Sequence, residues 1–246
     1  ADAYYNMGNA LKDKDKLEEA IKVYKKTLSL RPKNADAFYN MGAAFQEQGK
    51  LELAINAYNS ALLIRPNYVN AYYNLGNALK DRGKLEEAIN AYNKALSLKP
   101  DFANAYNNMG IALQNQGKLE KSLEAYNKAL LLQPDSAKTY INKGSILREQ
   151  GKPKEAIEAY KKALTIKPNS AEAYSNLGIA LTDHGKMKEG VEAFNKALSI
   201  DPDNAKDYWN LYGTAQNFVE AKKWIKKCLR ADPNHLEAKL KSFRKN

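Results

Sequence analysis

The sequence predicts an all-α protein, an α-solenoid built from tandem helical hairpins. Residues of the same kind recur every 34 positions, which is a period typical of two-helix repeats. Within each repeat, apolar residues fall at i, i+3, i+4 and i+7, the pattern of an amphipathic helix. A single repeat cannot bury this surface, so neighbouring repeats must stack. The glycines that define the step are Gly8, Gly42, Gly76, Gly110, Gly144 and Gly178.

The 34-residue step divides the chain into seven repeats and a tail. A seventh, degenerate repeat is about three residues short, because its Pro233 comes early. The tail is predicted to be a C-terminal capping helix with Leu236, Leu240 and Phe243 on one stripe. We expect the whole chain, 1–246, to form a single solenoid. The predicted repeats are 1–34, 35–68, 69–102, 103–136, 137–170, 171–204 and 205–235, followed by the capping helix 236–246.

Each repeat is predicted to hold two helices, and repeat 3 shows them most clearly. Tyr72, Leu75 and Leu79 form the apolar stripe of the first helix. Gly83 fits the left-handed residue that follows a helix end. Pro100 then stops the second helix, because proline cannot continue one.

The ends of the helices carry further signals. Pro153 falls in the expected first turn of a second helix, where a missing N–H does no harm. Asp15 replaces the turn glycine in repeat 1, and aspartate tolerates that geometry better than most residues. The predicted N-cap residues are Asn34, Ser136, Ser170 and Asn204.

The formal net charge of +11 raises the question of nucleic-acid binding. Residues 217–246 hold nine Lys and Arg against three acidic residues, which accounts for +6 of that charge. The inner groove predicted below has mixed charge, so no nucleic-acid partner is expected. The basic C-terminal patch is interpreted as a solvated face, with an acidic partner, nucleic acid or an anionic membrane surface as alternatives.

Several classes of protein are not expected. No stretch approaches the ~20 apolar residues of a membrane helix, so no membrane insertion is expected. His184 and His235 are far apart in sequence, which argues against a metal site. Cys228 is interpreted as a packing residue and allows no internal disulfide, which favours a reducing, cytoplasmic location. No catalytic residues and no cofactor are predicted, so the chain is not expected to be an enzyme.

The N-terminal repeat lacks the polar outer face that terminal repeats normally carry. Tyr4, Met7 and Leu11 are as apolar as their equivalents in interior repeats. The expectation is that upstream repeats were removed or that another molecule covers this end. Self-association through the uncapped N-terminal repeat is one form of such cover.

The repeat resembles the tetratricopeptide repeat (TPR) family. Repeat 3 matches the family pattern of aromatic, leucine, glycine, alanine and proline positions over its whole length. The resemblance covers about 235 residues, and it implies a right-handed superhelix whose first helices line the inner face. The matching residues are Tyr72, Leu75, Gly76, Ala88, Tyr92, Ala95 and Pro100.

Repeat position 6 is asparagine in every repeat, although asparagine is a mediocre helix former. The resemblance implies that this position faces the concave groove. A row of amides there could hold an extended peptide, and a similar ladder occurs in O-linked N-acetylglucosamine transferases. The alternative is that these residues bond a neighbouring helix or were copied by duplication. The ladder comprises Asn6, Asn40, Asn74, Asn108, Asn142, Asn176 and Asn210.

Positions 5 and 9 flank the ladder and complete the predicted peptide-binding site. Position 5 supplies Tyr5, Tyr39 and Tyr73, and position 9 supplies Asn9 and Asn77. The alternative for the tyrosines is packing against the next first helix. The predicted function is a non-catalytic scaffold that binds a protein or extended peptide. The other interpretation is a substrate-recognition arm of a larger glycosyltransferase- or methyltransferase-like enzyme whose catalytic domain lies outside this chain.

Overall fold

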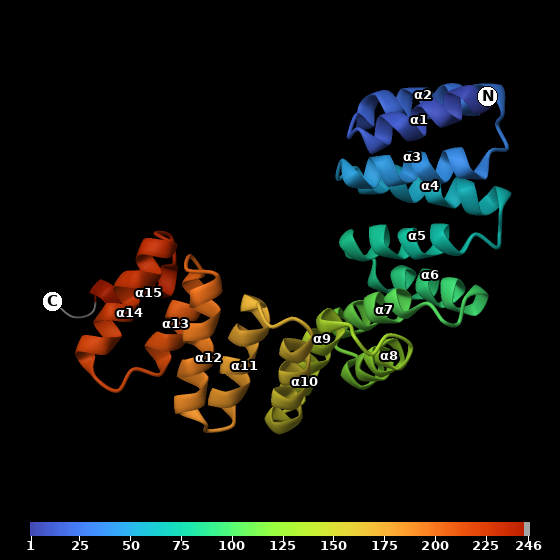
Figure 1. Ribbon diagram of the computed structural model, residues 1–246. Helices are drawn as coiled ribbons and strands as arrows, with labels where there is room; N and C mark the ends of the chain where they lie inside the picture. The colour runs from blue at the N-terminus through green and yellow to red at the C-terminus, as the bar shows by residue number, and fades with distance from the viewer. Residues whose placement is uncertain (244–246) are drawn as a thin grey trace. The chain divides into compact units, whose positions relative to one another are not determined.

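The computed structural model describes residues 1–243, and these residues form fifteen α-helices and no strand (Figure 1). The prediction of an all-α fold of tandem helical hairpins is therefore confirmed. The helices are α1 (Asp2–Asp13), α2 (Leu17–Leu30), α3 (Ala35–Glu47), α4 (Leu51–Ile64), α5 (Val69–Asp81), α6 (Leu85–Leu98), α7 (Ala103–Asn115), α8 (Leu119–Leu132), α9 (Ala137–Glu149), α10 (Pro153–Ile166), α11 (Ala171–Asp183), α12 (Met187–Ile200), α13 (Ala205–Gly213), α14 (Phe218–Ala231) and α15 (Leu236–Phe243).

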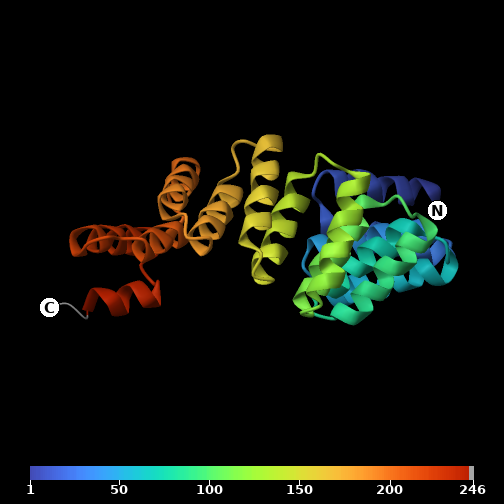
Figure 2. The ribbon, with the colours of Figure 1, turned by 90° about the horizontal axis from the view of Figure 1, so that it is seen from below.

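The chain falls into two compact parts, which are described separately. The N-terminal half is Ala1–Leu132 and the C-terminal half is Gln133–Asn246. In the N-terminal half the hairpins α1–α2, α3–α4 and α5–α6 follow one another as successive layers (Figure 1). The C-terminal half likewise consists of successive hairpins, α9–α10, α11–α12 and α13–α14, followed by α15 (Figure 2).

The helices begin and end where the local signals place them. The Oδ1 atom of Asn34 accepts the backbone N–H of Ala37 at 3.0 Å, which caps α3. Ser136, Ser170 and Asn204 cap α9, α11 and α13 in the same way. Gly83 has a φ of +81°, as a left-handed residue after a helix requires, and Asp15 takes the same region at 58°.

The first helices of the N-terminal half lie on the inner side of its curve. Each successive pair among α1, α3, α5 and α7 is in contact, and no comparable contact joins the second helices among the residues described. A stack whose first helices are closer together than its second helices must curve toward the first helices. This layer therefore forms the concave side of the N-terminal half.

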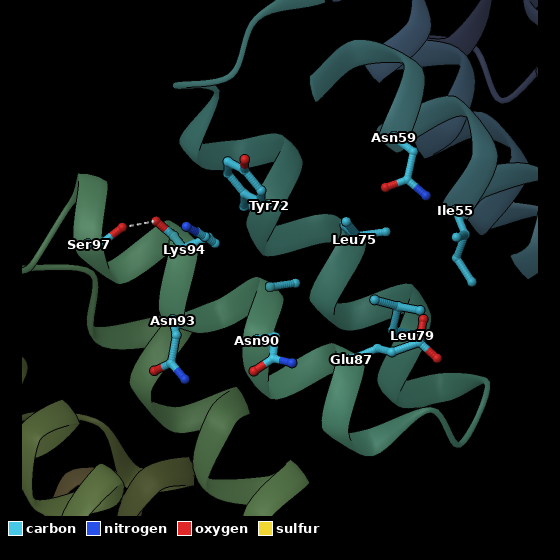
Figure 3. Close-up of a pocket in the computed structure, with 11 residues that line it drawn as sticks. Ile55, Asn59, Tyr72, Leu75, Leu79, Glu87, Asn90, Asn93, Lys94 and Ser97 are labelled. Carbon is cyan, nitrogen blue, oxygen red and sulfur yellow. Dashed lines mark hydrogen bonds between the residues drawn. The ribbon is translucent and has the colours of Figure 1, made fainter. Parts of the chain in front are cut away.

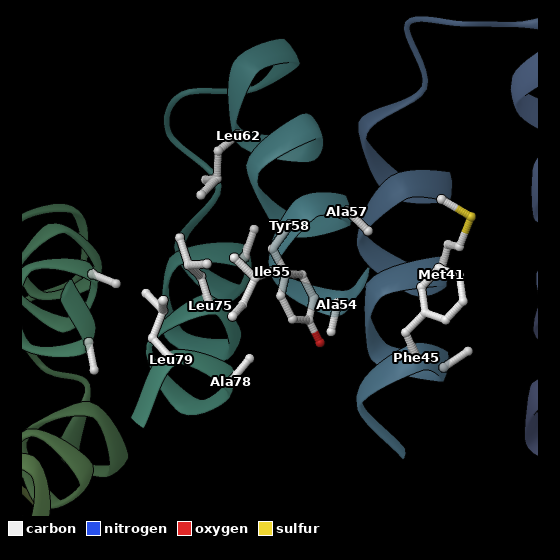
Figure 4. Close-up of a cluster of buried hydrophobic side chains, with 14 of the residues drawn as sticks. Met41, Phe45, Ala54, Ile55, Ala57, Tyr58, Leu62, Leu75, Ala78 and Leu79 are labelled. Atoms are coloured by element: carbon white, nitrogen blue, oxygen red, sulfur yellow. The ribbon is translucent and has the colours of Figure 1, made fainter. Parts of the chain in front are cut away.

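In the first six hairpins the core is built around one aromatic ring that lies between the two helices. Tyr58 of α4 is fully buried and lies beside Ala54 of the same helix, Phe45 of α3 and Ala78 of α5 (Figure 4). Gly42 of α3 faces this ring, and a Cβ atom there would lie 2.8 Å from Tyr58 Cε1. The recurring glycine thus makes room for the recurring aromatic residue.

The two ends of the chain differ in how they are covered. Tyr4 and Met7 of α1 are 41% and 51% exposed, whereas Trp224 of α14 is buried and stacks on Tyr208 with ring centroids 6.2 Å apart. Helix α15 packs on α14. The side chains predicted to form its apolar stripe, and residues 244–246 of the predicted cap, lie outside the described residues. Within residues 1–243, no helix combines the length and apolar character needed to cross a bilayer.

Candidate functional site

Three asparagines of the ladder are hydrogen-bonded to the preceding repeat. The Nδ2 atom of Asn40 donates to the hydroxyl of Tyr5 at 3.0 Å, and Asn74 donates to Tyr39 at the same distance. Asn108 repeats this contact with Tyr73, again at 3.0 Å. All three asparagines are half-buried. The amide nitrogens therefore join one first helix to the next, as the alternative interpretation of the ladder expected.

The asparagines at position 9 belong to the same network. Asn9 Oδ1 accepts two hydrogen bonds, from the Tyr24 hydroxyl at 2.8 Å and from Asn40 Nδ2 at 3.0 Å. Burial raises the pKa of Tyr24, so its hydroxyl stays protonated and donates. Because both partners donate, the oxygen of Asn9 must face them and its nitrogen must face away.

Asn77 repeats this arrangement two repeats later. Its Oδ1 accepts from the Tyr92 hydroxyl and from Asn108 Nδ2, both at 2.8 Å. Burial raises the pKa of Tyr92 as well, which keeps its hydroxyl a donor. The network is thus Tyr–Asn–Asn–Tyr in both places.

Other repeats satisfy the buried tyrosine with a different residue. Where position 9 is Ala43, the Tyr58 hydroxyl donates to Gln46 Oε1 at 2.9 Å. Tyr126 likewise donates to Gln114, and Tyr160 pairs with Ser145. In repeat 6, position 9 is Ile179 and the buried ring is Phe194, which has no hydroxyl to satisfy. This rule was not predicted from the sequence, although position 12 carries glutamine where position 9 is Ala43 or Ile111.

The atoms that point away from the network define what this face can bind. Asn9 Nδ2, Asn77 Nδ2 and Asn40 Oδ1 form no hydrogen bond with another described residue, and none is a buried unpaired atom. Asn74 Oδ1 also forms no hydrogen bond with another described residue. Asn108 Oδ1, in contrast, accepts a hydrogen bond from Asn107 at 3.1 Å. The concave face therefore offers both donors and acceptors to a ligand.

The tyrosine rings at position 5 are partly covered by the chain itself. Tyr39 lies 4.9 Å from Tyr68 and Tyr73 lies 4.8 Å from Phe102, measured between ring centroids. Tyr68 and Phe102 immediately precede the next first helices. The tyrosine rings thus pack on the N-cap residues of the next first helices, and their hydroxyls accept the ladder amides of those helices.

The remaining ladder residues lie in different surroundings. Asn6 is exposed on α1, while Asn142, Asn176 and Asn210 are half-buried on α9, α11 and α13. Position 5 of repeat 6 is Ser175, whose hydroxyl donates to the buried carboxylate of Asp207. The structure therefore brings together Tyr5, Asn9, Asn40, Tyr39, Asn74, Tyr73, Asn77 and Asn108, and among the described residues no tyrosine bond of this kind joins Asn6, Asn176 or Asn210 to the predicted site.

Asp207 is a buried group that the sequence analysis missed. Burial raises the pKa of its carboxyl, and the Ser175 hydrogen bond opposes that shift. Asn210 also opposes the rise in the pKa of this carboxyl, so the buried Asp207 Oδ2 and Asn210 Nδ2 face each other. The signal was present in the sequence, because most other repeats carry alanine at this position.

The hollows of the molecule lie away from the predicted site. One of 670 Å³ lies between α4, α5 and α6, with Tyr72, Leu75 and Leu79 of α5 on its floor (Figure 3). Equivalent hollows of 340, 510 and 620 Å³ recur at other repeats. None of the twelve predicted site residues lines any of these four. The predicted site is thus an open face with hydrogen-bonding atoms and not a closed pocket.

Metal-ligand clusters and the single cysteine were the two features left to place. Across residues 1–243, His, Cys, Asp and Glu side chains nowhere gather in threes as they would around a metal ion. Cys228 is buried, and this burial raises the pKa of its thiol, which disfavours the reactive thiolate.

The helical hairpins, the recurring glycine–aromatic contact and the open concave face define a helical-repeat protein. Models described as TPR repeat match residues 8–49, 46–81 and 76–117, and models described as tetratricopeptide repeat match 101–169, 147–213 and 210–235. The chain belongs to the tetratricopeptide repeat family, as the sequence predicted. No curated protein matches it.

Solved structures of similar proteins share the fold. The crystal structure of MamA is 31% identical, with a TM-score of 0.62, and the match covers 68% of this chain and 97% of MamA. YrrB, described as a TPR protein with an unusual peptide-binding site, is 21% identical over 76% of this chain and 96% of its own, with a TM-score of 0.63. PilF of Pseudomonas aeruginosa is 22% identical over 86% and 97%, with a TM-score of 0.73. Because 514 chains match, the fold by itself does not identify a ligand.

Proposed function

We propose that this chain is a non-catalytic scaffold that binds an extended peptide or protein segment along the first helices of its N-terminal half. The observation that carries the proposal is the set of outward-facing amide atoms on Asn9, Asn40, Asn74 and Asn77. An extended backbone exposes N–H and C=O groups in alternation, so it can use both kinds of atom. No cofactor and no nucleic acid take part, and the cytoplasm is the proposed location.

The hydrogen bonds within the face assign separate roles to its atoms. The nitrogens of Asn40 and Asn74 are committed to tyrosines, so these residues offer carbonyl oxygens to ligand N–H groups. Asn9 and Asn77 offer amide nitrogens to ligand carbonyls. Neighbouring helices pack ~8–10 Å apart and an extended chain advances ~3.3 Å per residue, so one repeat serves roughly three ligand residues. Each bond contributes ~0.5–1.5 kcal/mol, so binding needs several repeats.

Two further facts support the proposal. The network holds the amides in fixed orientations before any ligand arrives, which lowers the entropy cost of binding. YrrB, which has the same fold, is described as having a peptide-binding site. The alternative, that this face is the recognition arm of a larger enzyme, uses the same residues and the same mode of binding.

The test compares two variants that break the same hydrogen bond. Peptides are first selected from a random linear library against the wild-type chain, and their affinities are measured by fluorescence anisotropy. Asn74→Ala removes the outward oxygen and also the bond to Tyr39. Tyr39→Phe removes only that bond and leaves the asparagine in place.

We expect Asn74→Ala to weaken peptide binding about three- to tenfold, which corresponds to one net hydrogen bond. Tyr39→Phe should bind nearly as well as wild type. Equal affinities of all three proteins for the selected peptides would contradict the proposed function. Thermal unfolding of both variants checks that losing the hydrogen bond between residues 74 and 39 lowers their stability equally.

A further inference from the structure

We propose that the concave face of the N-terminal half contains two matched subsites, centred on Asn9 and Asn77, that each bind an uncharged hydrogen-bond-accepting side chain of the ligand. This inference rests on the proposed function, because it assumes that a peptide lies along this face. It adds the ligand's own pattern: two amide or hydroxyl side chains at a set spacing, separated by a more apolar stretch.

The two subsites share three equivalent hydrogen bonds. Around Asn9 the distances are 2.8 Å from Tyr24 and 3.0 Å from Asn40, and Asn40 donates to Tyr5 at 3.0 Å. The equivalent distances around Asn77 are 2.8, 2.8 and 3.0 Å. In both subsites the asparagine oxygen already accepts two bonds. Two N–H groups therefore remain at each subsite for an incoming acceptor.

The charges beside each subsite favour an uncharged acceptor. Lys12 lies three residues after Asn9 on α1 and is followed by Asp13. Lys80 and Asp81 repeat this pair after Asn77, and the two are joined by a 2.7 Å ion pair. At the first subsite Glu47 of α3 adds a second negative group, since both Asp13 and Glu47 help to raise the pKa of Tyr24. Neither subsite therefore carries an excess of positive charge that would attract a carboxylate. The side chains of Asn, Gln, Ser and Thr fit such a neutral donor better than Asp or Glu.

The repeat between the subsites lacks the donor. Position 9 there is Ala43, and the Tyr58 hydroxyl that would need an asparagine donates to Gln46 at 2.9 Å instead. Position 9 itself offers only a methyl group, and the nearest side-chain amide is that of Gln46, three residues further along the helix. A polar ligand side chain would gain no hydrogen bond from position 9 here, so an apolar side chain is preferred.

The spacing of the two ligand side chains follows from the stack. Asn9 and Asn77 are two repeats apart, so two steps of ~8–10 Å between first helices separate them by roughly 16–20 Å. An extended chain covers that distance in about five or six residues at ~3.3 Å each. The ligand is therefore a segment with two Asn, Gln, Ser or Thr residues at about that separation.

The experiment selects peptides from a random linear library against the wild-type chain and against Asn77→Asp. Aspartate keeps an oxygen for Tyr92 and Asn108 but replaces both open N–H groups by an acceptor. We expect wild type to select peptides with two amide or hydroxyl residues at the stated separation. We expect Asn77→Asp to change one of these two positions to Lys or Arg and leave the other unchanged. Wild-type-selected peptides should bind this variant about tenfold more weakly.

The chain itself supplies a second pair of variants that preserve the fold. Asn77→Ala with Lys80→Gln copies the Ala43 and Gln46 arrangement, so Tyr92 keeps an acceptor while the subsite is lost. Ala43→Asn with Gln46→Lys copies Asn77 and Lys80 into repeat 2. The first double variant should select peptides with one polar position, and the second should select a third polar position between the other two.

The outcomes separate this inference from the proposed function. Suppose the selected peptides lose affinity for Asn74→Ala but show no spaced polar pair, or keep the same preference with Asn77→Asp. The subsites are then refuted while peptide binding along the face stands. If no peptide is selected, or Asn74→Ala binds all of them as wild type does, the proposed function itself is wrong.

Discussion

The ring of Tyr92 occupies the space where a side chain on Gly76 would begin. A Cβ atom built on Gly76 would lie 2.5 Å from Tyr92 Cε1 and 2.7 Å from Cδ1. The ring is fully buried, and its hydroxyl is held by Asn77 at 2.8 Å, so it cannot move without breaking that bond. The contact links the packing of the hairpin to the hydrogen-bond network of the concave face.

Gly76→Ala should destabilise the N-terminal half. Overpacking of this kind costs ~1–3 kcal/mol, which outweighs the gain of up to ~1 kcal/mol that alanine brings to a helix. Gly213→Ala is the matched control, because a Cβ atom there meets nothing within 4 Å. Urea unfolding followed by circular dichroism should show a lower midpoint for Gly76→Ala and no loss for Gly213→Ala. An unchanged midpoint in Gly76→Ala would show that the ring moves aside.

Gln46→Ala should leave the hydroxyl of Tyr58 buried without an acceptor. Such a loss costs ~1–3 kcal/mol of unfolding free energy. Adding Ala43→Asn should recover most of it, because asparagine at this position accepts the equivalent hydroxyl in repeats 1 and 3. Tyr58→Phe should likewise reduce the cost of Gln46→Ala. Additive effects in this double-mutant cycle would contradict the exchange of acceptors between positions 9 and 12.

Asp207 should make the C-terminal half less stable as pH rises. Its folded-state pKa is raised by burial, so its stabilising contribution is complete below the unfolded-state pKa. That contribution is lost as pH rises through the folded-state value, because ionisation then puts a charge in a buried position. Asp207→Ala, the residue of most other repeats, removes this dependence and should stabilise the protein at neutral pH by ~1–3 kcal/mol.

The measurement for Asp207 is the unfolding midpoint of wild type and Asp207→Ala from acidic to neutral pH. The difference between the two should grow toward neutral pH. Asp203→Ala is the control, since Asp203 is exposed in the preceding turn. A constant difference across the pH range would mean that the carboxyl of Asp207 does not titrate there.

The exposed face of α1 leads to a prediction about self-association. Tyr4 and Met7 are 41% and 51% exposed. Their equivalents in the second repeat, Phe38 and Met41 of α3, pack in the core of the N-terminal half. We expect sedimentation velocity to show concentration-dependent association of the wild-type chain, and Met7→Glu to abolish it. Val219→Glu, at another exposed apolar residue, should leave association unchanged. A monomeric wild type at all concentrations contradicts the prediction.

The helical hairpins could be predicted from the sequence because their determinants are local and repeated. Pro153 marks the first residue of α10, and Asn34 and Ser136 cap their helices with their own side chains. Such signals act within a few residues, so they are visible without knowledge of the fold. The 34-residue step also predicts the order in which the hairpins stack, because each repeat packs only on its neighbours in the sequence.

The orientation of the candidate site was decided by contacts between residues that are distant in the chain. Asn108 bonds Tyr73, which lies 35 residues earlier, and Asn77, which lies 31 residues earlier. The family resemblance implied that the asparagines face the groove, and the sequence left open whether their amides would meet a ligand or a neighbouring helix. The buried Asp207 likewise contacts Ser175, 32 residues earlier, and the sequence signalled it only by its departure from the alanine of most other repeats.

The sequence by itself determined the family and the hairpins, because periodicity and capping are properties of short segments. Only the tertiary structure decided which amide atoms are committed and which remain open. A side-chain amide has both a donor and an acceptor, and its orientation is set by the donors and acceptors of the neighbouring helix. For Asn9 those neighbours are Tyr24 and Asn40, and they leave its nitrogen facing outward.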